Sequence, residues 1–248
     1  MNFDVNEAAR ILVGAHRART TIAPSGPGPG NRAEAFAVQD AALSALGPAG
    51  GWKVGAKGPA EEPICAPMPA SLCRTSPCIW PTAEFRAPIV EAEIAFRIGR
   101  DLRPGDPAPS RSELPGWVDG VHAALEIVDS RLDGYPDVDR LWALADNQSN
   151  GGFVVSAAGR PWRGEDFASA AVRLVIDGAV RADGRRPNPA GDPARLVLWF
   201  LAQASGRGGV AAGTYVTTGS YTGMIAVGAG SRVEAEFPGI GTVELHLS

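Results

Sequence analysis

The segment Ile89–Ile98 constrains the fold more than any other part of the chain. Every even-numbered residue in it is apolar, in the series Val90, Ala92, Ile94, Phe96 and Ile98. This strict alternation has the two-residue period of a β-strand that buries one of its faces. Two acidic residues, Glu91 and Glu93, occupy odd-numbered positions on the opposite face. We therefore expect a strand with one packing face and one acidic face.

Several other segments have strand patterns. The nearly continuous apolar run from Val121 to Asp129 is typical of a buried strand. Further strands are predicted at 152–156, 172–180 with a turn at Asp177-Gly178, 214–218, 232–237 and 242–247, the last two joined by a turn at 238–241. The Pro-rich stretch 58–82 is predicted to be a long irregular loop, of the kind that forms lids or binding loops.

Helical patterns are concentrated near the N-terminus. Helices are predicted at 5–19, 32–46 and 137–146, and from Asp192-Pro193 to Ala204, where Asp is a favourable N-cap and Pro is tolerated in the first turn. We therefore predict an α+β fold in a single domain, 1–248. Its helical N-terminal portion, 1–50, packs on a β-rich catalytic core, 51–248.

Charge and composition exclude several classes of protein. The net charge of −4 argues against a nucleic-acid partner or a membrane-surface patch, since both need a basic excess. No apolar run reaches the roughly 20 residues of a membrane span, and the acidic N-terminus does not resemble a signal peptide. The three cysteines, Cys65, Cys73 and Cys78, lack the paired spacing of a zinc site. We predict a cytoplasmic protein with reduced cysteines.

Lysine is rare in this chain. Of its 23 basic residues, only Lys53 and Lys57 are lysines. Arginine supplies a fixed charge but does not release its proton in proteins, whereas a lysine with a lowered pKa does. One of these lysines is therefore a candidate for proton transfer. The alternative is that two lysines survived a compositional bias toward arginine.

The strongest candidate site begins with Glu91 and Glu93, because side chains two positions apart on a strand point to the same face of the sheet. Neighbouring carboxylates repel each other unless a cation binds between them or one holds a proton. Glu126 lies inside the apolar run, where an unpaired charge is costly. The three glutamates together would suit Mg²⁺ or Mn²⁺. The alternatives are a solvated acidic face for the pair, and for Glu126 a buried ion pair with Arg131 or another arginine. Asp129 has the opposite strand parity and is expected to pair with Arg131 instead.

Two loops combine small polar side chains with glycine. They are Ala145-Asp-Asn-Gln-Ser-Asn-Gly-Gly152 and Thr217-Thr-Gly-Ser-Tyr-Thr-Gly223. Such loops bring backbone N–H groups close to a bound carboxylate, although each is also compatible with a plain turn.

Together these motifs resemble a known family. They are Gly51-Trp-Lys-Val-Gly55, Val90–Phe96 with Gly99-Arg-Asp-Leu102, Ala124–Arg131, Ala145-Asp-Asn147 and Thr217-Thr-Gly-Ser220. In their order and spacing they resemble the 2-keto-4-pentenoate hydratase / 4-oxalocrotonate decarboxylase branch of the fumarylacetoacetate hydrolase superfamily. The resemblance implies a β-rich roll of that superfamily's C-terminal-domain type with peripheral helices. It also implies small 2-oxo acid substrates from aromatic catabolism and a homo-oligomer, with a complex with an aldolase or decarboxylase of the same pathway as a further expectation.

The resemblance also assigns the site. Glu91, Glu93 and Glu126 match the metal ligands, with Mg²⁺ or Mn²⁺ expected, and Lys53 matches the catalytic lysine. Asp146 and Ser149 are expected to assist catalysis, and Thr218, Gly219 and Ser220 to bind substrate. The implied reaction is a hydro-lyase reaction that adds water to a 2-oxo-4-enoic acid such as 2-oxopent-4-enoate through a metal-stabilised enolate. Lys57 has no matching role.

Other activities remain open at the sequence level. The same metal site supports decarboxylation of a 2-oxo-enedioate or C–C hydrolysis of an acylpyruvate. Hydrolysis needs a base to activate water, and His122 shares strand parity with Glu126. An alternative outside the enzymes is a protein that binds a 2-oxo acid without catalysis, or a partner subunit of an active homologue. The loop Asp146-Asn-Gln-Ser-Asn-Gly151 departs from the family's Asp-Asn-Ala-Ser-Ser-Gly pattern, which leaves the substrate's tail undetermined.

Overall fold

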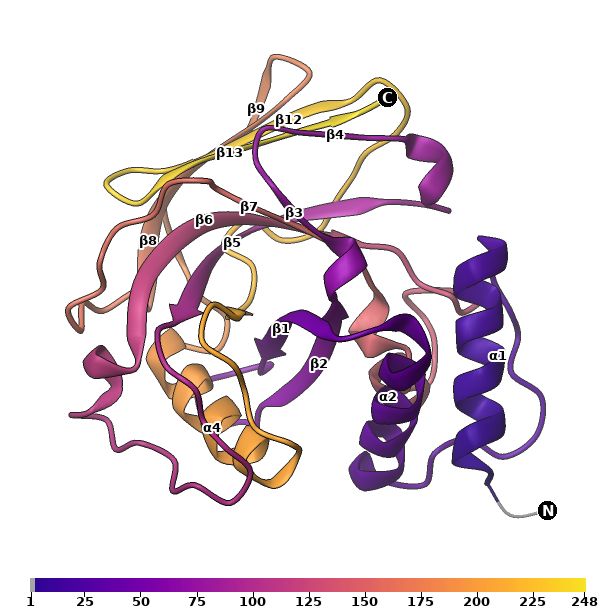
Figure 1. Ribbon diagram of the computed structural model, residues 1–248. Helices are drawn as coiled ribbons and strands as arrows, with labels where there is room; N and C mark the ends of the chain where they lie inside the picture. Colours follow the sequence, from indigo (N-terminus) through magenta and orange to yellow (C-terminus); the bar gives the residue numbers. More distant parts are fainter. Residues whose placement is uncertain (1–2) are drawn as a thin grey trace.

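The computed structural model describes residues 3–248, and β-strands dominate it. The strands are β1 (Ala49–Gly55), β2 (Ile64–Pro69), β3 (Cys73–Thr75), β4 (Cys78–Trp80), β5 (Ile89–Ile98), β6 (Val118–Val128), β7 (Asn150–Val155), β8 (Ser169–Ile176), β9 (Ala179–Pro187), β10 (Tyr215–Thr217), β11 (Ile225–Ala226), β12 (Arg232–Phe237) and β13 (Gly241–Leu247). The first sheet has the order β2-β1-β10-β5-β6-β7-β3, with β11 added to β5, and the second has the order β4-β13-β12-β8-β9. The second sheet lies across the strongly curved first sheet (Figure 1).

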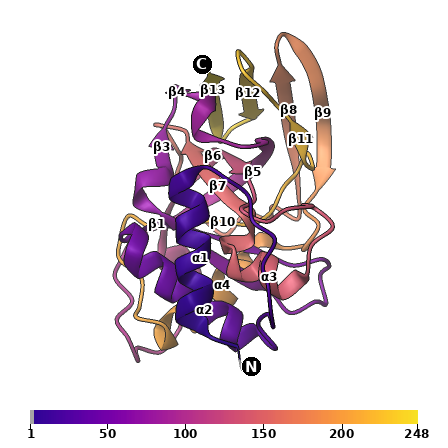
Figure 2. The ribbon, with the colours of Figure 1, turned by 90° about the vertical axis from the view of Figure 1, so that its right-hand side faces the viewer.

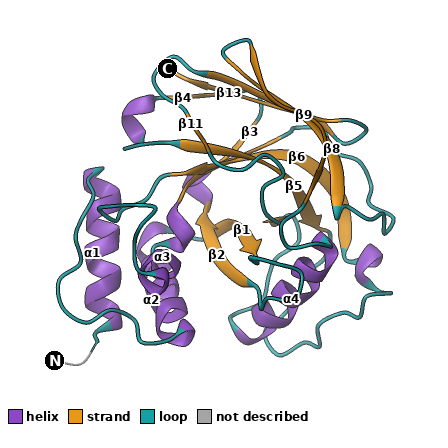
Figure 3. Cartoon of the chain, turned by 180° about the vertical axis from the view of Figure 1, so that it is seen from behind, coloured by secondary structure: helices purple, strands orange, loops and turns teal. Residues whose placement is uncertain are grey.

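The helices occupy two places. They are α1 (Val5–Ala18), α2 (Arg32–Leu46), α3 (Arg140–Ala145) and α4 (Pro193–Gly206). The first three pack together at one side of the sheets (Figures 2 and 3), whereas α4 packs apart from them, against β1 of the first sheet (Figure 3). Asp4, Asn31 and Asp192 accept backbone N–H groups as N-caps of α1, α2 and α4. The predicted α+β, β-rich class is confirmed.

The central feature of the core is the long antiparallel pair β5–β6. The even-numbered residues of β5 are all fully buried and belong to the main hydrophobic cluster, as the alternation predicted. This cluster extends to α4, where the rings of Trp52 and Phe200 lie 5.2 Å apart. Because both faces of β5 are covered, the acidic face of this strand also lies inside the protein.

The prediction of an irregular loop over 58–82 is wrong. The segment contains β2, β3 and β4, and β2 pairs with β1 along its whole length. Proline-rich sequence is tolerated because all three are edge strands, where an absent backbone N–H leaves no ladder bond unmade. Edge position is decided by strand order, which this local sequence does not reveal.

The predicted strand over 172–180 is one half of a hairpin. The turn lies at Asp177-Gly178 as expected, with both residues at positive φ, and β9 returns as far as Pro187. Strand β9 was not predicted, because it is an edge strand whose residues are mostly exposed and show no apolar alternation. The hairpin of β12 and β13 is confirmed.

Two smaller expectations concern cysteines and membranes. Cys65, Cys73 and Cys78 are all free thiols. None of the helices within residues 3–248 combines the length and apolar character that a bilayer crossing requires.

Candidate active site

Three carboxylates meet on the β5–β6 pair. Glu91 lies directly opposite Glu126 in the antiparallel register, and Glu93 follows on the same face of β5. One carboxylate oxygen from each lies within 4.8 Å of the other two. Glu93 and Glu126 are 2% and 1% exposed, and Glu91 is partly buried. The register of one strand pair therefore assembles a compact three-carboxylate cluster.

The electrostatics of this cluster fit a cation. Burial, followed by the charges of Glu126 and Glu91, raises the pKa of Glu93 to about 8. Burial and the charge of Glu126 also raise the pKa of Glu91. Three carboxylates with convergent oxygens, two of them fully buried, form the hard donor set that Mg²⁺ and Mn²⁺ prefer, and a divalent ion would relieve their repulsion. The residues present therefore fit a divalent metal.

Lys53 on β1 faces the same cluster. Its Nζ donates hydrogen bonds to Oε1 of Glu126 and, over 3.0 Å, to the carbonyl of Gln148. The Asn150 amide also donates to Oε1 of Glu126, over 3.1 Å. Glu126 is thus a buried ion-pair partner of Lys53 rather than of an arginine. Burial opposes the charge of Lys53, but the carboxylates Glu126 and Glu91 outweigh it and raise its pKa, so this lysine is an ammonium beside the carboxylates.

The topology of the first sheet brings Lys53 to this position. Strand β1 pairs in parallel with β10, with Lys53 opposite Thr217, and β10 pairs with β5, with Thr217 opposite Ala95. The lysine therefore lies two strands away from the carboxylates of β5, and the curvature of the sheet directs their side chains to the same interior.

The segment after β10 forms a turn against the cluster. The backbone N–H of Gly219 donates to Oε2 of Glu93 over 3.1 Å, and the Thr218 hydroxyl donates to the carbonyl of Ile94 over 3.2 Å. Gly219 has φ of 93°, a conformation that favours glycine. The Asn188 amide donates to the Thr218 carbonyl over 2.9 Å and holds the turn from the other side.

Asp146 and Ser149 are not among the residues that line the cavity around the carboxylates. Asp146 is buried in an ion pair with Arg131, whose backbone N–H also donates to it over 3.0 Å. This pair anchors Asn147, Gln148 and Ser149, three consecutive non-glycine residues at positive φ. Such a left-handed run is strained and persists because its surroundings hold it. Its effect is to place the Gln148 carbonyl against Lys53.

Two further predictions concern the strand β6. His122 packs edge-on against the ring of Tyr215, contacts the carbonyl of Ser156 and lies outside the cavity. The predicted pairing of Asp129 with Arg131 is wrong, because Asp129 pairs with Arg86 at 2.7 Å. The side chain of Arg131 turns to Asp146 instead.

A cavity of about 570 Å³ opens in front of the carboxylates, within the size range of small-molecule sites. The predicted residues that line it are Lys53, Glu91, Glu93, Glu126, Thr218, Gly219 and Ser220. Four further residues that line the cavity were not predicted: Gln148, Arg186, Asn188 and Tyr221. Gln148 could have been found from its place in the polar loop Asp146–Gly151. No sequence pattern pointed to Arg186 and Asn188, because strand β9 itself was not predicted.

The β-rich core of the chain matches a known protein family. The model of the fumarylacetoacetate (FAA) hydrolase C-terminal domain matches residues 51–248. The chain belongs to the fumarylacetoacetate hydrolase family. This confirms the resemblance that the sequence motifs indicated.

Several curated members of the FAA hydrolase family are similar to this chain. A 2-keto-4-pentenoate hydratase of Paraburkholderia phymatum is 30% identical over 259 residues, covering 98% of this chain and 97% of the relative. One of Paraburkholderia xenovorans is 33% identical over 169 residues, or 67% of this chain, and the match spans 61% of the relative's length. The solved structure of 4-oxalocrotonate decarboxylase from Pseudomonas putida G7, complexed with magnesium and adipate, has a TM-score of 0.81 and 22% identity, covering 98% and 97% of the two chains. At this identity the likeness shows the shared fold.

Proposed function

We propose that this protein is a metal-dependent hydratase that adds water to a short 2-oxo-4-enoic acid, such as 2-oxopent-4-enoate, to give a 4-hydroxy-2-oxo acid. The observation that carries the proposal is an ammonium, Lys53, held against three converging carboxylates at the base of one cavity. The names of the curated relatives support a hydratase reaction.

The three glutamates are the proposed ligands of Mg²⁺ or Mn²⁺. The magnesium in the similar decarboxylase structure supports this choice of ion class. When bound, such a cation supplies Lewis-acid polarisation of the 2-oxo acid and stabilises negative charge on its keto oxygen. Glu93 is held in place by the N–H of Gly219, and Glu126 by Lys53 and Asn150.

The hydration takes two stages. First, a proton leaves carbon 3 and one is added at carbon 5, which moves the double bond to between carbons 3 and 4, into conjugation with the keto group. Water then adds across this double bond: its hydroxyl oxygen bonds to carbon 4, and the proton that the water loses ends on carbon 3. Because Lys53 is an ammonium at rest, we assign it to deliver the proton to carbon 5 and, as the amine so formed, to accept the proton from carbon 3; it lines the cavity, and its hydrogen bonds to Glu126 and Gln148 hold its Nζ in place.

The turn 218–220 has a supporting role. Thr218, Gly219 and Ser220 line the cavity, and the N–H of Gly219 donates to Glu93. We assign this turn to orienting the carboxylate of the substrate. Asp146 and Arg131 act behind it, since they fix the Gln148 carbonyl that positions Lys53.

Hydrolysis of an acylpyruvate is less well supported. It requires a base that activates water, normally His or Glu; within residues 3–248 no histidine lines the cavity, and the three glutamates that line it are the proposed metal ligands. His122, the candidate for that role, lies four residues before Glu126 on the same face of β6 but outside the cavity, where it contacts Tyr215 and Ser156.

A direct assay tests the proposed function. Purified protein supplied with Mn²⁺ or Mg²⁺ is expected to consume 2-oxopent-4-enoate, followed by loss of the absorbance of its enol, with 4-hydroxy-2-oxopentanoate as the product. Chelation of the metal is expected to stop turnover, and its return to restore it. Absence of turnover with a series of short 2-oxo-enoates, while calorimetry shows the metal bound, would rule out the hydratase.

A further inference from the structure

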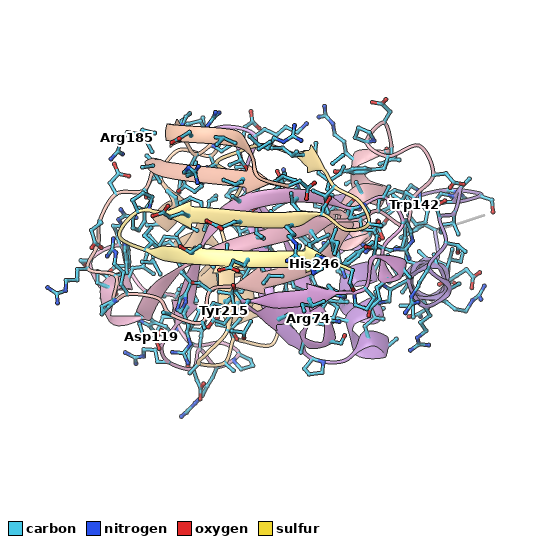
Figure 4. All side chains as sticks on the ribbon, turned by 90° about the horizontal axis from the view of Figure 1, so that it is seen from above. Arg74, Asp119, Trp142, Arg185, Tyr215 and His246 are labelled. Carbon is cyan, nitrogen blue, oxygen red and sulfur yellow. The ribbon has the colours of Figure 1, made fainter. Side chains whose placement is uncertain are left out.

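Arg186 on β9 points into the cavity. Along this edge strand Ala182 and Asn188 are buried and Arg186, which has the same parity, is partly buried. Its neighbour Arg185 has the opposite parity and is exposed at the outside of the molecule (Figure 4). Arg186 lines the cavity together with Pro187 and Asn188, whereas Arg185 does not.

This guanidinium has no partner within residues 3–248. Arg186 forms no ion pair and no side-chain hydrogen bond there, and its Nε is buried without an acceptor. Arg185, by contrast, donates to the carbonyl of Ser169 over 2.6 Å. Arginine keeps its charge at all accessible pH values, and a buried donor without an acceptor is unfavourable. The cavity therefore presents a fixed positive charge that protein groups do not neutralise.

The carboxylate cluster does not serve as that partner. None of its three glutamates lies within 4.0 Å of Arg186, and the cation paired with the cluster is Lys53. The cavity thus presents two separate charged features. The glutamates offer carboxylates for a cation, and Arg186 offers a guanidinium, which is the side chain best suited to bind a carboxylate through two parallel hydrogen bonds.

We propose that Arg186 binds a second carboxylate, at the end of the substrate remote from its 2-oxo acid group. This inference rests on the proposed function, in which the 2-oxo acid group lies at the glutamate cluster. It makes the preferred substrate a 2-oxo-enoic diacid rather than a monocarboxylate like 2-oxopent-4-enoate. A monocarboxylate would leave the guanidinium unpaired, and so Arg186 is a residue that determines specificity.

Binding of saturated analogues tests this assignment, because they cannot be hydrated. The Mn²⁺-loaded protein is titrated by calorimetry with 2-oxoglutarate, 2-oxoadipate and 2-oxopimelate. Each is compared with the monocarboxylic 2-oxo acid of the same chain length. We expect the diacid of best-fitting length to bind about tenfold or more tightly than its monocarboxylic match, as a charge-assisted bidentate pair implies.

Variants assign the preference to one residue. R186Q is expected to lose the preference, because its affinity for the diacid falls about tenfold further than its affinity for the matched monocarboxylic acid. R186K is expected to retain part of the preference. R185Q, the matched control on the same strand, is expected to keep all of it. The circular dichroism of each variant reports its folding, and R186K supplies the result if R186Q does not fold. Equal binding of diacids and monocarboxylates by the wild type, or an undiminished preference in R186Q, would overturn the role of Arg186 and leave the hydratase standing. Binding of no 2-oxo acid would overturn both.

Discussion

At the scale of single residues, the structure distinguishes the two lysines that the composition of the chain had singled out. Lys53 and Lys57 differ in burial and in their contacts. Lys53 is 12% exposed at its side chain and bonded to Glu126, whereas Lys57 lies in the exposed segment after β1 and does not line the cavity. The expectation of a lowered pKa for Lys53 does not hold beside the carboxylates, because their charges outweigh its burial.

Replacing Lys53 by arginine separates proton transfer from charge. K53R keeps the positive charge beside Glu126 but supplies a group that does not release its proton. We expect kcat to fall by about 10²- to 10⁴-fold, the usual contribution of a positioned acid–base group, with Mn²⁺ affinity by calorimetry unchanged. K57R is the matched control and should behave as wild type. Near-normal kcat in K53R would show that Lys53 contributes charge alone.

The buried ion pairs illustrate why partner choice is hard to predict from sequence. Arg131 is two residues from Asp129, yet its side chain binds Asp146 and Asp129 binds Arg86. Parity along the strand showed that Asp129 faces away from Glu126. It did not show which distant arginine would arrive there, because that depends on the packing of the segment before β5.

At the scale of elements, interior strands with a strong apolar period were predicted correctly, whereas edge strands with a weak period were not predicted. β5 and both long N-terminal helices were predicted with nearly the observed bounds, since apolar residues recur with the correct period. The short strands β2, β3 and β4 lie at sheet edges and carry prolines or polar residues. Edge strands bury little apolar surface on their own, and so their sequences carry little periodic signal.

The packing of α1 is expected to make the stability of the protein depend on pH. His16 on α1 has its pKa lowered to about 4 by burial and by the charges of Arg131 and Arg86, which exceed the opposing effect of Asp129. The unfolded state, with an ordinary histidine pKa, therefore binds more protons between about pH 6.5 and pH 4. Stability is expected to rise with pH across this window and to be lost on acidification.

Urea unfolding at pH 7 and pH 5 measures this effect. We expect H16Q to have a smaller loss of unfolding free energy on acidification than the wild type, by about 1 kcal/mol once the partial exposure of His16 is allowed for. Comparing the two proteins cancels the carboxylates that titrate in both. H246Q is a control, because this histidine lies on β13, far along the chain from α1 (Figure 4). Identical losses in H16Q and wild type would contradict the assignment.

At the scale of the whole molecule, the site exists only in the folded chain. Its three carboxylates come from β5 and β6, its lysine from β1, and the turn beside them from the segment after β10. These residues lie between positions 53 and 220 of the chain. A cation that binds this cluster binds the native state far better than the unfolded chain, and so it must stabilise the fold.

Metal addition should therefore raise the melting temperature. At a Mn²⁺ concentration about 100 times its dissociation constant, mass action adds about 2.7 kcal/mol to the unfolding free energy. For a chain of this size we expect a shift of about 5 to 10 °C by scanning calorimetry, reversed by a chelator. E93Q should lose most of the shift, and E234Q, which replaces an exposed glutamate of β12, should retain it. An equal shift in E93Q would place the metal elsewhere.

The sequence by itself determined the parts of this protein that depend on local order. The alternation of apolar residues predicted β5, and the shared parity of Glu91 and Glu93 placed them on one face of that strand. The short motifs indicated the family. Each of these is a relation between residues that lie near one another in the chain. The tertiary structure decided the relations between distant segments. The register of β5 with β6 brought Glu126 opposite Glu91, sheet order brought Lys53 to Glu126, and the return of β9 brought Arg186 into the cavity. Strand pairing follows from the collective burial of the core, and no local pattern contains that information.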